Sequence, residues 1–330
     1  MRILALVPGG IGDQILFFPT LDDLKRYYPK AEIDVIVEPR AMGAYRVCKS
    51  VDEVLKFDFK DRNGPADFGN LLGIIRDREY DAALTLGRRW SVGLLLWMTG
   101  IPTRIGYDVG VGRWFFTNPV PLNTEQYAAS MYHDLLKGFG IDSPCPELAI
   151  SVPKQDIQWA EAEQERLGIK ESGYILIHGG SSQLAQSKGI DKIYPAQKWQ
   201  QIVEDIQQKQ PDLPIVLLQG PEDAQWLTAM TQANPELKIT APEDIGKLAA
   251  MIAGANLMLC TDSAPMHLAV AVGTYTLALF GPTEAKKLLP PSASTVGQIS
   301  DSRYFGLQSP TCGIADINPE DVLKQLWSAS

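Results

Sequence analysis

The sequence predicts an α/β protein built from two doubly wound parallel-sheet domains. The chain has 330 residues, which is too long for one ordinary core and suits two domains. Short apolar, β-branched runs alternate along it with longer stretches of helical period, the pattern of a parallel sheet covered by helices. A segment with three prolines, 141–153, separates two such series. We therefore expect a boundary near residue 155, between domains 1–154 and 155–330.

In the first domain, strands are predicted where apolar and β-branched residues run together. The chain begins with such a run, which Pro8-Gly9-Gly10 cuts short of a signal-peptide core. Apolar side chains at helical spacing predict helices between the strands. The strands are Ile3–Val7, Ile33–Val37 and Ala82–Leu86, and the helices lie around 68–75 and over 127–139.

The second domain repeats this alternation after a polar connecting helix over 154–170. The last helix, 318–328, opens with Asn-Pro-Glu, a helix-start signal, and has one apolar face. That face suits either domain, and packing back on the first is one expected arrangement. The predicted strands are Tyr174–His178, Ile215–Gln219, Leu257–Cys260 and Thr276–Phe280, with helices near 196–209, 222–233, 244–254 and 264–272.

Composition excludes several classes of function. A formal charge of -9 and a pI near 5.0 provide no basic stripe for nucleic acid. The four cysteines form no close pair, so neither a zinc spacing nor a redox CxxC is present, as expected of a reducing compartment. The most apolar later stretch, 92–101, is too short to span a bilayer. We expect a cytoplasmic protein, with peripheral membrane contact left open.

The first candidate site is the glycine loop 8–13, which joins the first strand to a helix. It echoes a dinucleotide fingerprint, but glycines at Gly9, Gly10 and Gly12 leave the third glycine of G-x-G-x-x-G missing. Asp13 has two interpretations. It can cap the backbone N–H groups of the helix, or it can accept a proton from a substrate hydroxyl as a general base.

The second candidate is the small-residue loop after the strand ending at His178, which contains Ser181 and Ser182. Backbone N–H groups of such a loop can approach phosphate oxygens closely. Lys188 and Lys192 follow, and a lysine here can either neutralise an anion or remain an ordinary solvated side chain.

The third candidate is the run 261–269, where a buried strand stops at Thr261-Asp262-Ser263 and a helix with an early proline follows. The N–H groups of that helix start form an anion site. Asp262 or Ser263 can instead cap the helix, and His267 can be a core histidine. The turn Gly281-Pro282-Thr283 is expected to line the same place.

These residues resemble glycosyltransferase family 9, the ADP-heptose:lipopolysaccharide heptosyltransferases. The run 261–269, followed by Leu279-Phe280-Gly281-Pro282-Thr283, is similar to the family's signature. The sequence Gly10-Ile11-Gly12-Asp13 and the sequence Lys192-Ile193-Tyr194-Pro195 match two further landmarks in the right order. The resemblance covers nearly the whole chain.

The resemblance implies a GT-B architecture with an acceptor domain first and a nucleotide-sugar domain second. It also implies an inverting enzyme that uses neither a metal nor a cofactor, and no acidic D-x-D triplet stands out here. Asp13 would be the base, on the loop that contains Gly10 and Gly12. The donor would be held by Lys192 (or Lys188), Glu222, Asp262, Ser263, Ala264 and His267, beside the loop containing Ser181 and Ser182. The acceptor would be lipopolysaccharide or a related lipid-linked glycan.

Three alternatives stay open. A nucleotide-sugar epimerase of similar fold would share the donor site but need no acceptor. A non-catalytic nucleotide- or glycan-binding module is suggested by Ala264 and Tyr275, where the family usually has glycine and proline. A nicotinamide-dependent oxidoreductase is disfavoured by the missing glycine.

Overall fold

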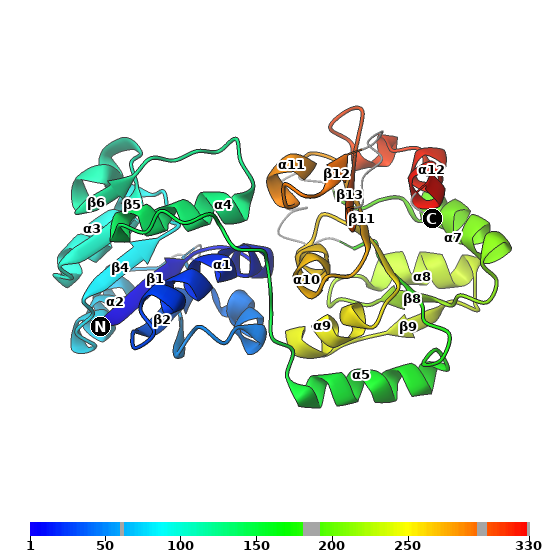
Figure 1. Ribbon diagram of the computed structural model, residues 1–330, viewed down its shortest axis with the longest axis horizontal. Coiled ribbons are helices and arrows are strands. Elements are labelled where there is room, and N and C mark those ends of the chain that lie inside the picture. Colours follow the sequence, from blue (N-terminus) through cyan, green and yellow to red (C-terminus); the bar gives the residue numbers. More distant parts are fainter. Residues whose placement is uncertain (60–62, 181–191, 296–301, 329–330) are drawn as a thin grey trace. The chain divides into compact units, whose positions relative to one another are not determined.

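The structure is a computed structural model that describes residues 1–59, 63–180, 192–295 and 302–328. Its internal contacts divide the chain into two compact units, Met1–Ser151 and Val152–Ser330. Each unit is a parallel sheet with helices on both faces (Figure 1). The expected doubly wound α/β fold is therefore confirmed for both halves. The boundary expected at residue 155 falls in the first turn of α5 (Lys154–Leu167), which belongs to the second unit.

The first sheet has six parallel strands in the order β3-β2-β1-β4-β5-β6. The predicted strands are its three central ones, whose side chains are buried almost throughout, as expected for strands covered on both faces. The order reverses between β1 and β4, which creates a switch point there. The strands are β1 (Arg2–Val7), β2 (Glu32–Val37), β3 (Glu53–Lys56), β4 (Ala82–Thr85), β5 (Thr103–Tyr107) and β6 (Asn118–Val120).

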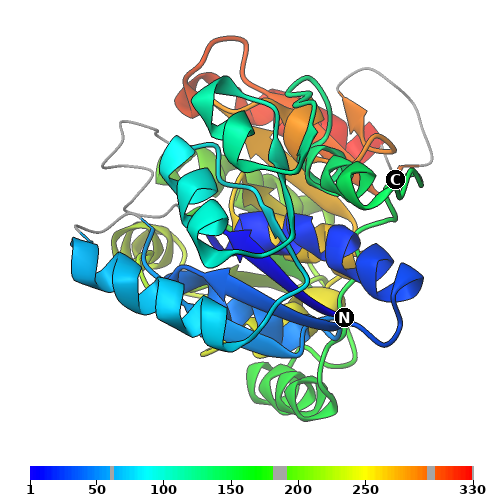
Figure 2. The ribbon, with the colours of Figure 1, turned by 90° about the vertical axis from the view of Figure 1, so that its left-hand side faces the viewer.

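Helices cover both faces of this sheet, as Figure 2 shows from the side of the first unit. On one face, α2 (Pro65–Asp77) and α3 (Trp90–Thr99) pack on alternate residues of β1, Leu4 and Leu6. The helix α1 (Ile11–Tyr27) packs with α4 (Ala128–His133) and with the 3-10 segments η1 (Pro39–Val47) and η3 (Asp134–Phe139), and the 3-10 segment η2 (Gly110–Phe115) lies along α3.

The single helix predicted over 127–139 is instead a short α-helix, α4, followed by the tighter η3. The last turn lies against β5 so closely that a Cβ on Gly138 would come within 2.6 Å of Ile105 Cγ2. Tertiary packing and the glycines near its end therefore outweigh the helical period here.

The second sheet has seven parallel strands in the order β12-β13-β11-β10-β7-β8-β9. Its four predicted strands are β7, β8, β10 and β11, and its switch point lies between β7 and β10, which are paired directly. The strands are β7 (Ile175–His178), β8 (Ile215–Leu218), β9 (Lys238–Thr240), β10 (Leu257–Thr261), β11 (Thr276–Phe280), β12 (Ser294–Thr295) and β13 (Tyr304–Gln308).

The helices of the second unit confirm the predicted series. One face of the sheet is covered by α7 (Ala196–Lys209) and α8 (Ala224–Ala233), whose apolar side chains form one core with the strands. The helices α5, α9 (Ile245–Ala253) and α10 (Ala264–Val272) pack successively on one another. Short segments α11 (Ala285–Leu288) and η4 (Ile314–Asp316) complete the unit.

The final helix, α12 (Pro319–Ser328), packs on α7 within the second unit. Trp327 Nε1 donates to Asp205 Oδ1 at 2.8 Å, and Val322 is buried in the core of that unit. The apolar face of α12 therefore serves the second domain, one of the two that the sequence left open. This face joins the same core as α7. The two helices are far apart in the sequence, so no local pattern indicates that they pack together.

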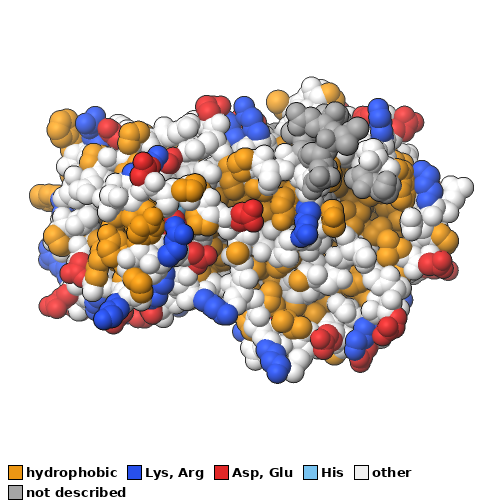
Figure 3. Space-filling view, viewed as in Figure 1, with side chains coloured by type: hydrophobic (Ala, Val, Ile, Leu, Met, Phe, Trp, Pro, Cys, Tyr) orange, Lys and Arg blue, Asp and Glu red, His pale blue; other side chains and the backbone are white. Residues whose placement is uncertain are grey.

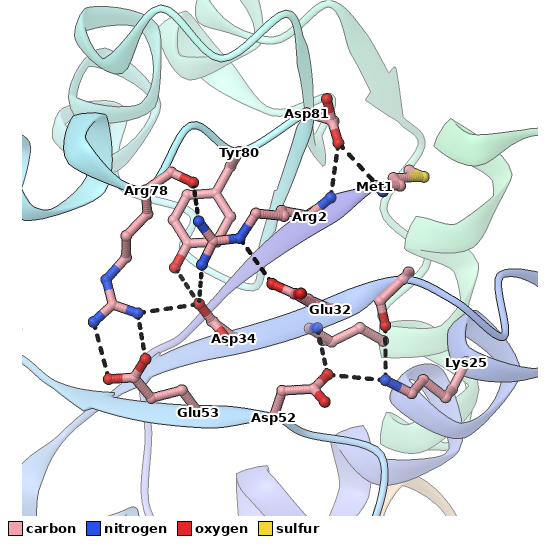
Figure 4. A network of polar contacts seen from close by, with 12 residues as sticks. Met1, Arg2, Lys25, Glu32, Asp34, Asp52, Glu53, Arg78, Tyr80 and Asp81 are labelled. Atoms are coloured by element: carbon pink, nitrogen blue, oxygen red, sulfur yellow. Dashed lines mark hydrogen bonds and ion pairs between the residues drawn. The ribbon is translucent and has the colours of Figure 1, made fainter.

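The amino edge of the first sheet carries a dense network of charges (Figure 4). Asp34, only 3% exposed, accepts from Tyr80 Oη at 2.6 Å and from Arg78 Nη1 at 3.3 Å. Arg78 also binds both carboxylate oxygens of Glu53, one at 2.9 Å. Arg2 Nε lies 3.0 Å from Glu32 Oε2. These groups join β1, β2, β3 and the turn before β4.

Candidate functional site

The loop between β1 and α1 lies at the carboxyl edge of the first sheet, at its switch point. Gly9 has a φ of 143°, and a Cβ there would lie 2.4 Å from Asp13 Oδ2, so this position requires glycine. The Gly10 N–H donates to Asp13 Oδ2 at 2.8 Å. Gly12 is half-buried in the first turn of α1. Asp13 thus caps the helix, one of its two expected roles.

The other oxygen of the Asp13 carboxylate also has a partner. Tyr132, from α4, donates its hydroxyl to Asp13 Oδ1 at 3.0 Å. Burial, followed by the charge and hydrogen bond of Asp13, raises the pKa of Tyr132 well above its ordinary value, so the phenol stays a donor. Each carboxylate oxygen has a second lone pair, and Asp13 is half-exposed. Capping and proton acceptance are therefore chemically compatible.

A lysine, a carboxylate and a hydroxyl meet at the carboxyl edge of the second sheet. Lys192 Nζ donates to Asp262 Oδ2 at 2.5 Å, and Thr283 Oγ1 donates to the same oxygen at 2.7 Å. Asp262 follows β10 and Thr283 follows β11, so neighbouring strands bring them together. The Lys192 side chain is 18% exposed. Asp262 accepts a hydrogen bond from one of the three N–H groups of the Lys192 ammonium and so fixes the position of its charge.

A second chain of hydrogen bonds crosses the switch point itself. His178, the last residue of β7, lies between Ser263 Oγ, 3.1 Å from Nδ1, and Asp223 Oδ2, 3.2 Å from Nε2. Burial acts to raise the pKa of Asp223, but its bonds to His178 and to the Gly220 N–H hold that pKa below the ordinary value. The imidazole ring thus links the Asp223 carboxylate to the Ser263 hydroxyl.

The N-terminus of α10 follows directly after these residues. Ser263 occupies the N-cap position but makes no side-chain cap, because its hydroxyl contacts His178 and the Thr261 carbonyl, 3.2 Å away. The interpretation of Asp262 or Ser263 as a helix cap is therefore wrong: Asp262 binds Lys192 and Thr283 instead. Ala264 is the first helical residue and Pro265 the second, which has no N–H to donate. The positive end of the α10 dipole thus lies beside Ser263 and Asp262.

The remaining predicted site residues lie in different environments. His267, on α10, is 4% exposed. Glu222 is an exposed residue of the loop after β8, next to the buried Asp223. Ser181, Ser182 and the alternative cation Lys188 lie outside the described residues. The structure brings together Lys192, Asp262, Ser263 and Ala264 in the second unit, while Asp13, Gly10 and Gly12 belong to the first.

Sequence reasoning missed Tyr132 and gave no role to His178 or Asp223. Tyr132 lies 119 residues from Asp13 and has no local motif. His178 and Asp223 carry a usable signal, since each stands at or just after the carboxyl end of a predicted strand, where ligands of parallel sheets bind. No described helix combines the length and apolar character that crossing a bilayer requires.

Comparison with known proteins agrees with this geometry. The family model described as glycosyltransferase family 9 (heptosyltransferase) matches residues 70–306. Lipopolysaccharide heptosyltransferase 3 of Escherichia coli is 26% identical, over 83% of this chain and 81% of its own length. The photosynthetic NDH subunit of subcomplex B 1 from the chloroplast of Arabidopsis thaliana is 25% identical, over 96% of this chain and 71% of its own length.

A solved structure shares the fold across the whole chain. The E. coli ADP-heptose lps heptosyltransferase II superposes with a TM-score of 0.76 at 19% identity, covering 100% of this chain and 98% of that one. The fold is therefore the GT-B fold of the heptosyltransferases. Since the family model spans more than half of the sequence, the chain belongs to glycosyltransferase family 9, the heptosyltransferase family.

Proposed function

We propose that this protein is an inverting glycosyltransferase that moves a sugar from a nucleotide-sugar donor to a lipopolysaccharide or related glycan acceptor. The donor is an ADP-linked sugar, a heptose in the first instance, and the acceptor is lipid-linked at the cytoplasmic face of a membrane. The reaction uses no metal. ADP-heptose is the substrate in the name of the E. coli structural neighbour, which supports this donor as the first to test.

One observation carries the proposal: a cation, a hydroxyl and the positive end of a helix converge at the switch point of the second sheet. Lys192, Ser263 and the α10 N-terminus can each donate to phosphate oxygens. Asp262 and Thr283 orient the lysine, while His178 and Asp223 orient the serine. This arrangement suits a diphosphate in a chain whose net charge is -9, because the positive potential is local.

The chemistry follows from these roles. Asp13 takes the proton of an acceptor hydroxyl while that oxygen forms a bond to the anomeric carbon of the donor sugar. The bond from the anomeric carbon to the diphosphate oxygen breaks on the opposite face, and its electron pair leaves with the nucleoside diphosphate. Lys192 and the helix end stabilise the charge that develops there. A single displacement inverts the anomeric centre.

Thermal-shift titration with ADP, UDP, GDP and their sugars tests the donor, because a ligand of the folded state raises its melting temperature. We expect ADP and ADP-sugars to give the largest shift. Transfer to a lipopolysaccharide acceptor should persist in excess chelator. Loss of transfer on chelation, with recovery on adding magnesium or manganese, would contradict the metal-free mechanism.

Asp13→Asn tests the base. An amide retains an oxygen that can accept from the Gly10 N–H, so the fold and the ADP affinity should stay within about twofold, while transfer falls about 10²–10⁴-fold. The matched control is Asp67→Asn, because Asp67 Oδ2 accepts from the Gly64 N–H at 2.8 Å in the same capping geometry on α2. Equal losses in both variants would assign Asp13 to capping alone.

A non-catalytic nucleotide-binding subunit is the second candidate. It is favoured by the chloroplast NDH subunit among the relatives, whose name describes a component of a complex. In that case ADP would bind, but neither transfer nor donor hydrolysis would exceed background. A nucleotide-sugar epimerase would instead convert the donor with no acceptor present, and tight NAD binding would indicate an oxidoreductase.

A further inference from the structure

The most exposed large hydrophobic side chains of the described chain lie together on the first unit. Trp114 is 78% exposed, Val111 68%, Trp90 58% and Trp97 55%. All four belong to α3 and η2, and three of the seven tryptophans in the protein are among them. We call these four residues the tryptophan surface. Isolated exposed hydrophobic residues are ordinary, but such a group marks an interaction site.

The helix α3 and the segment η2 form a single surface because glycines at their contact let the two backbones approach closely. A Cβ on Gly93 of α3 would lie 3.1 Å from the Gly112 carbonyl oxygen, and one on Gly112 would lie 3.5 Å from the Trp90 Cα. Trp97 is tilted against Phe115 at a ring distance of 6.4 Å. Trp90 and Trp97 are two helical turns apart and therefore face the same side of α3.

The outer side of α3 is apolar like its inner side. The helix has no charged residue between Trp90 and Thr99, and its inner side packs in the core through Leu95 and Leu96. An amphipathic surface helix would instead be polar on its solvent side. On the face drawn in Figure 3, hydrophobic side chains are exposed over the first unit, which is on the left. A helix whose outer side faced only water would not be expected to expose apolar side chains there.

Charge is also segregated here. Residues 82–124 contain four arginines and a single acid, Asp108, a formal +3 in a chain of -9. Arg104 donates to the Phe115 carbonyl. Arg89, exposed, adjoins Trp90, and the Arg113 guanidinium, 48% exposed, lies 5.4 Å from the Trp114 ring centroid and 3.1 Å from Asp108. The exposed cations thus border the tryptophan surface.

We propose that the tryptophan surface docks on a bilayer that contains anionic lipid. The three indoles insert at the level of the headgroups, where tryptophan is enriched in membrane proteins, and Arg89 and Arg113 face lipid phosphates. The rest of the acidic chain is repelled by an anionic bilayer, so the positive charge beside the tryptophan surface orients this surface toward the membrane. The docking is independent of the donor site and of its chemistry.

Vesicle flotation of the full chain tests this proposal without any nucleotide. We expect the protein to float with vesicles of phosphatidylcholine and phosphatidylglycerol, to stay largely unbound with phosphatidylcholine alone, and to show a blue shift of tryptophan emission on binding. Arg113→Ser should weaken the partition coefficient about fivefold. Trp114→Ser, which removes the most exposed indole, should weaken it about tenfold.

The second unit provides a matched control. Tyr275 is 54% exposed, and the Arg303 guanidinium lies 5.8 Å from its ring centroid, much like the pair Arg113 and Trp114. Tyr275→Ser and Arg303→Ser should leave flotation unchanged. Equal losses in the control variants, or no flotation of the wild type with either vesicle, would overturn the proposal. Self-association in sedimentation that Trp114→Ser abolishes, without vesicle binding, would assign the surface to a second copy of the chain instead.

Discussion

The amino edge of the first sheet and the carboxyl edge of the second both carry buried carboxylates with cationic partners. Asp34 is 3% exposed and Asp262 6%. At the amino edge, Arg78 binds both Asp34 and Glu53, and Arg2 pairs with Glu32, so each guanidinium is enclosed by carboxylates (Figure 4). At the carboxyl edge, Lys192 pairs with a single carboxylate among the described residues and lies beside the N-terminus of a helix.

Burial and pairing therefore do not distinguish a binding site from a structural clamp. The position on the sheet does, because loops and helix N-termini gather at the carboxyl ends of parallel strands, whereas helix C-termini gather at the amino ends. An added anion at the amino edge would meet carboxylates and negative helix ends. At the carboxyl edge it would meet an oriented ammonium and positive helix ends.

The largest expected effect comes from breaking the amino-edge network of Arg2, Glu32, Asp34, Glu53, Arg78 and Tyr80, which we call the clamp. Asp34→Ala removes the acceptor shared by Tyr80 and Arg78 and leaves both groups partly buried without it. The free energy of unfolding should fall by about 3 kcal/mol, because removing one partner of a buried pair leaves the other desolvated without a compensating interaction. Urea titration of the purified variant measures this loss.

The same variant should bind ADP as the wild type does, because the clamp belongs to the first unit and the proposed donor site to the second. Asp34→Asn, which keeps the volume and one acceptor, should recover part of the stability. A loss below about 1 kcal/mol for Asp34→Ala would mean that solvent replaces the carboxylate at little cost.

The next effect concerns ligand binding. Lys192→Met should raise the dissociation constant for ADP at least about tenfold, since a charge-assisted hydrogen bond to phosphate contributes about 1.5–3 kcal/mol. Lys247→Met is the control: Lys247 is 19% exposed and lies 2.6 Å from Glu243 Oε2, which matches Lys192 in exposure and ion-pair distance, while its carboxylate partner is exposed and at no proposed site. Isothermal titration calorimetry compares the two. Equal affinities would remove Lys192 from the donor site and leave the α10 N-terminus as the anion-binding element.

Much of the fold could be predicted from the sequence because the central strands of a parallel sheet are buried on both faces and read as continuous apolar runs. Edge strands gave no such signal: β3 is partly exposed along its length, and β6 has three residues, one of them Pro119. The sequence left open which domain α12 packs on, because an apolar helix face does not specify its partner.

Residues of the candidate site could be proposed from the sequence only where they form a contiguous motif. The run Thr261-Asp262-Ser263 marked the correct strand end, and Lys192 was one of two lysines considered. The interactions that orient them come from distant segments: Ser263 meets His178 across 85 positions, and Asp13 meets Tyr132 across 119. Such contacts depend on strand order, which spacing along the chain does not encode.

The smallest expected effect is a pH-dependent loss of stability when Glu53, at the amino edge, is replaced. The hydrogen bond from Arg78 lowers the pKa of Glu53 below its ordinary value of 4.5. A lowered carboxyl pKa stabilises the folded state above the unfolded pKa, and this contribution is lost as the pH falls through the folded value. Glu53→Gln should therefore cost about 0.5 kcal/mol at neutral pH, as expected for a half-exposed ion pair, and the gap from the wild type should close below pH 4.5. Urea unfolding of both proteins at neutral and acidic pH measures the gap. A difference that persists at acidic pH would show that Glu53 acts through packing or neutral hydrogen bonds, and the amino edge would then not be an electrostatic clamp at this position.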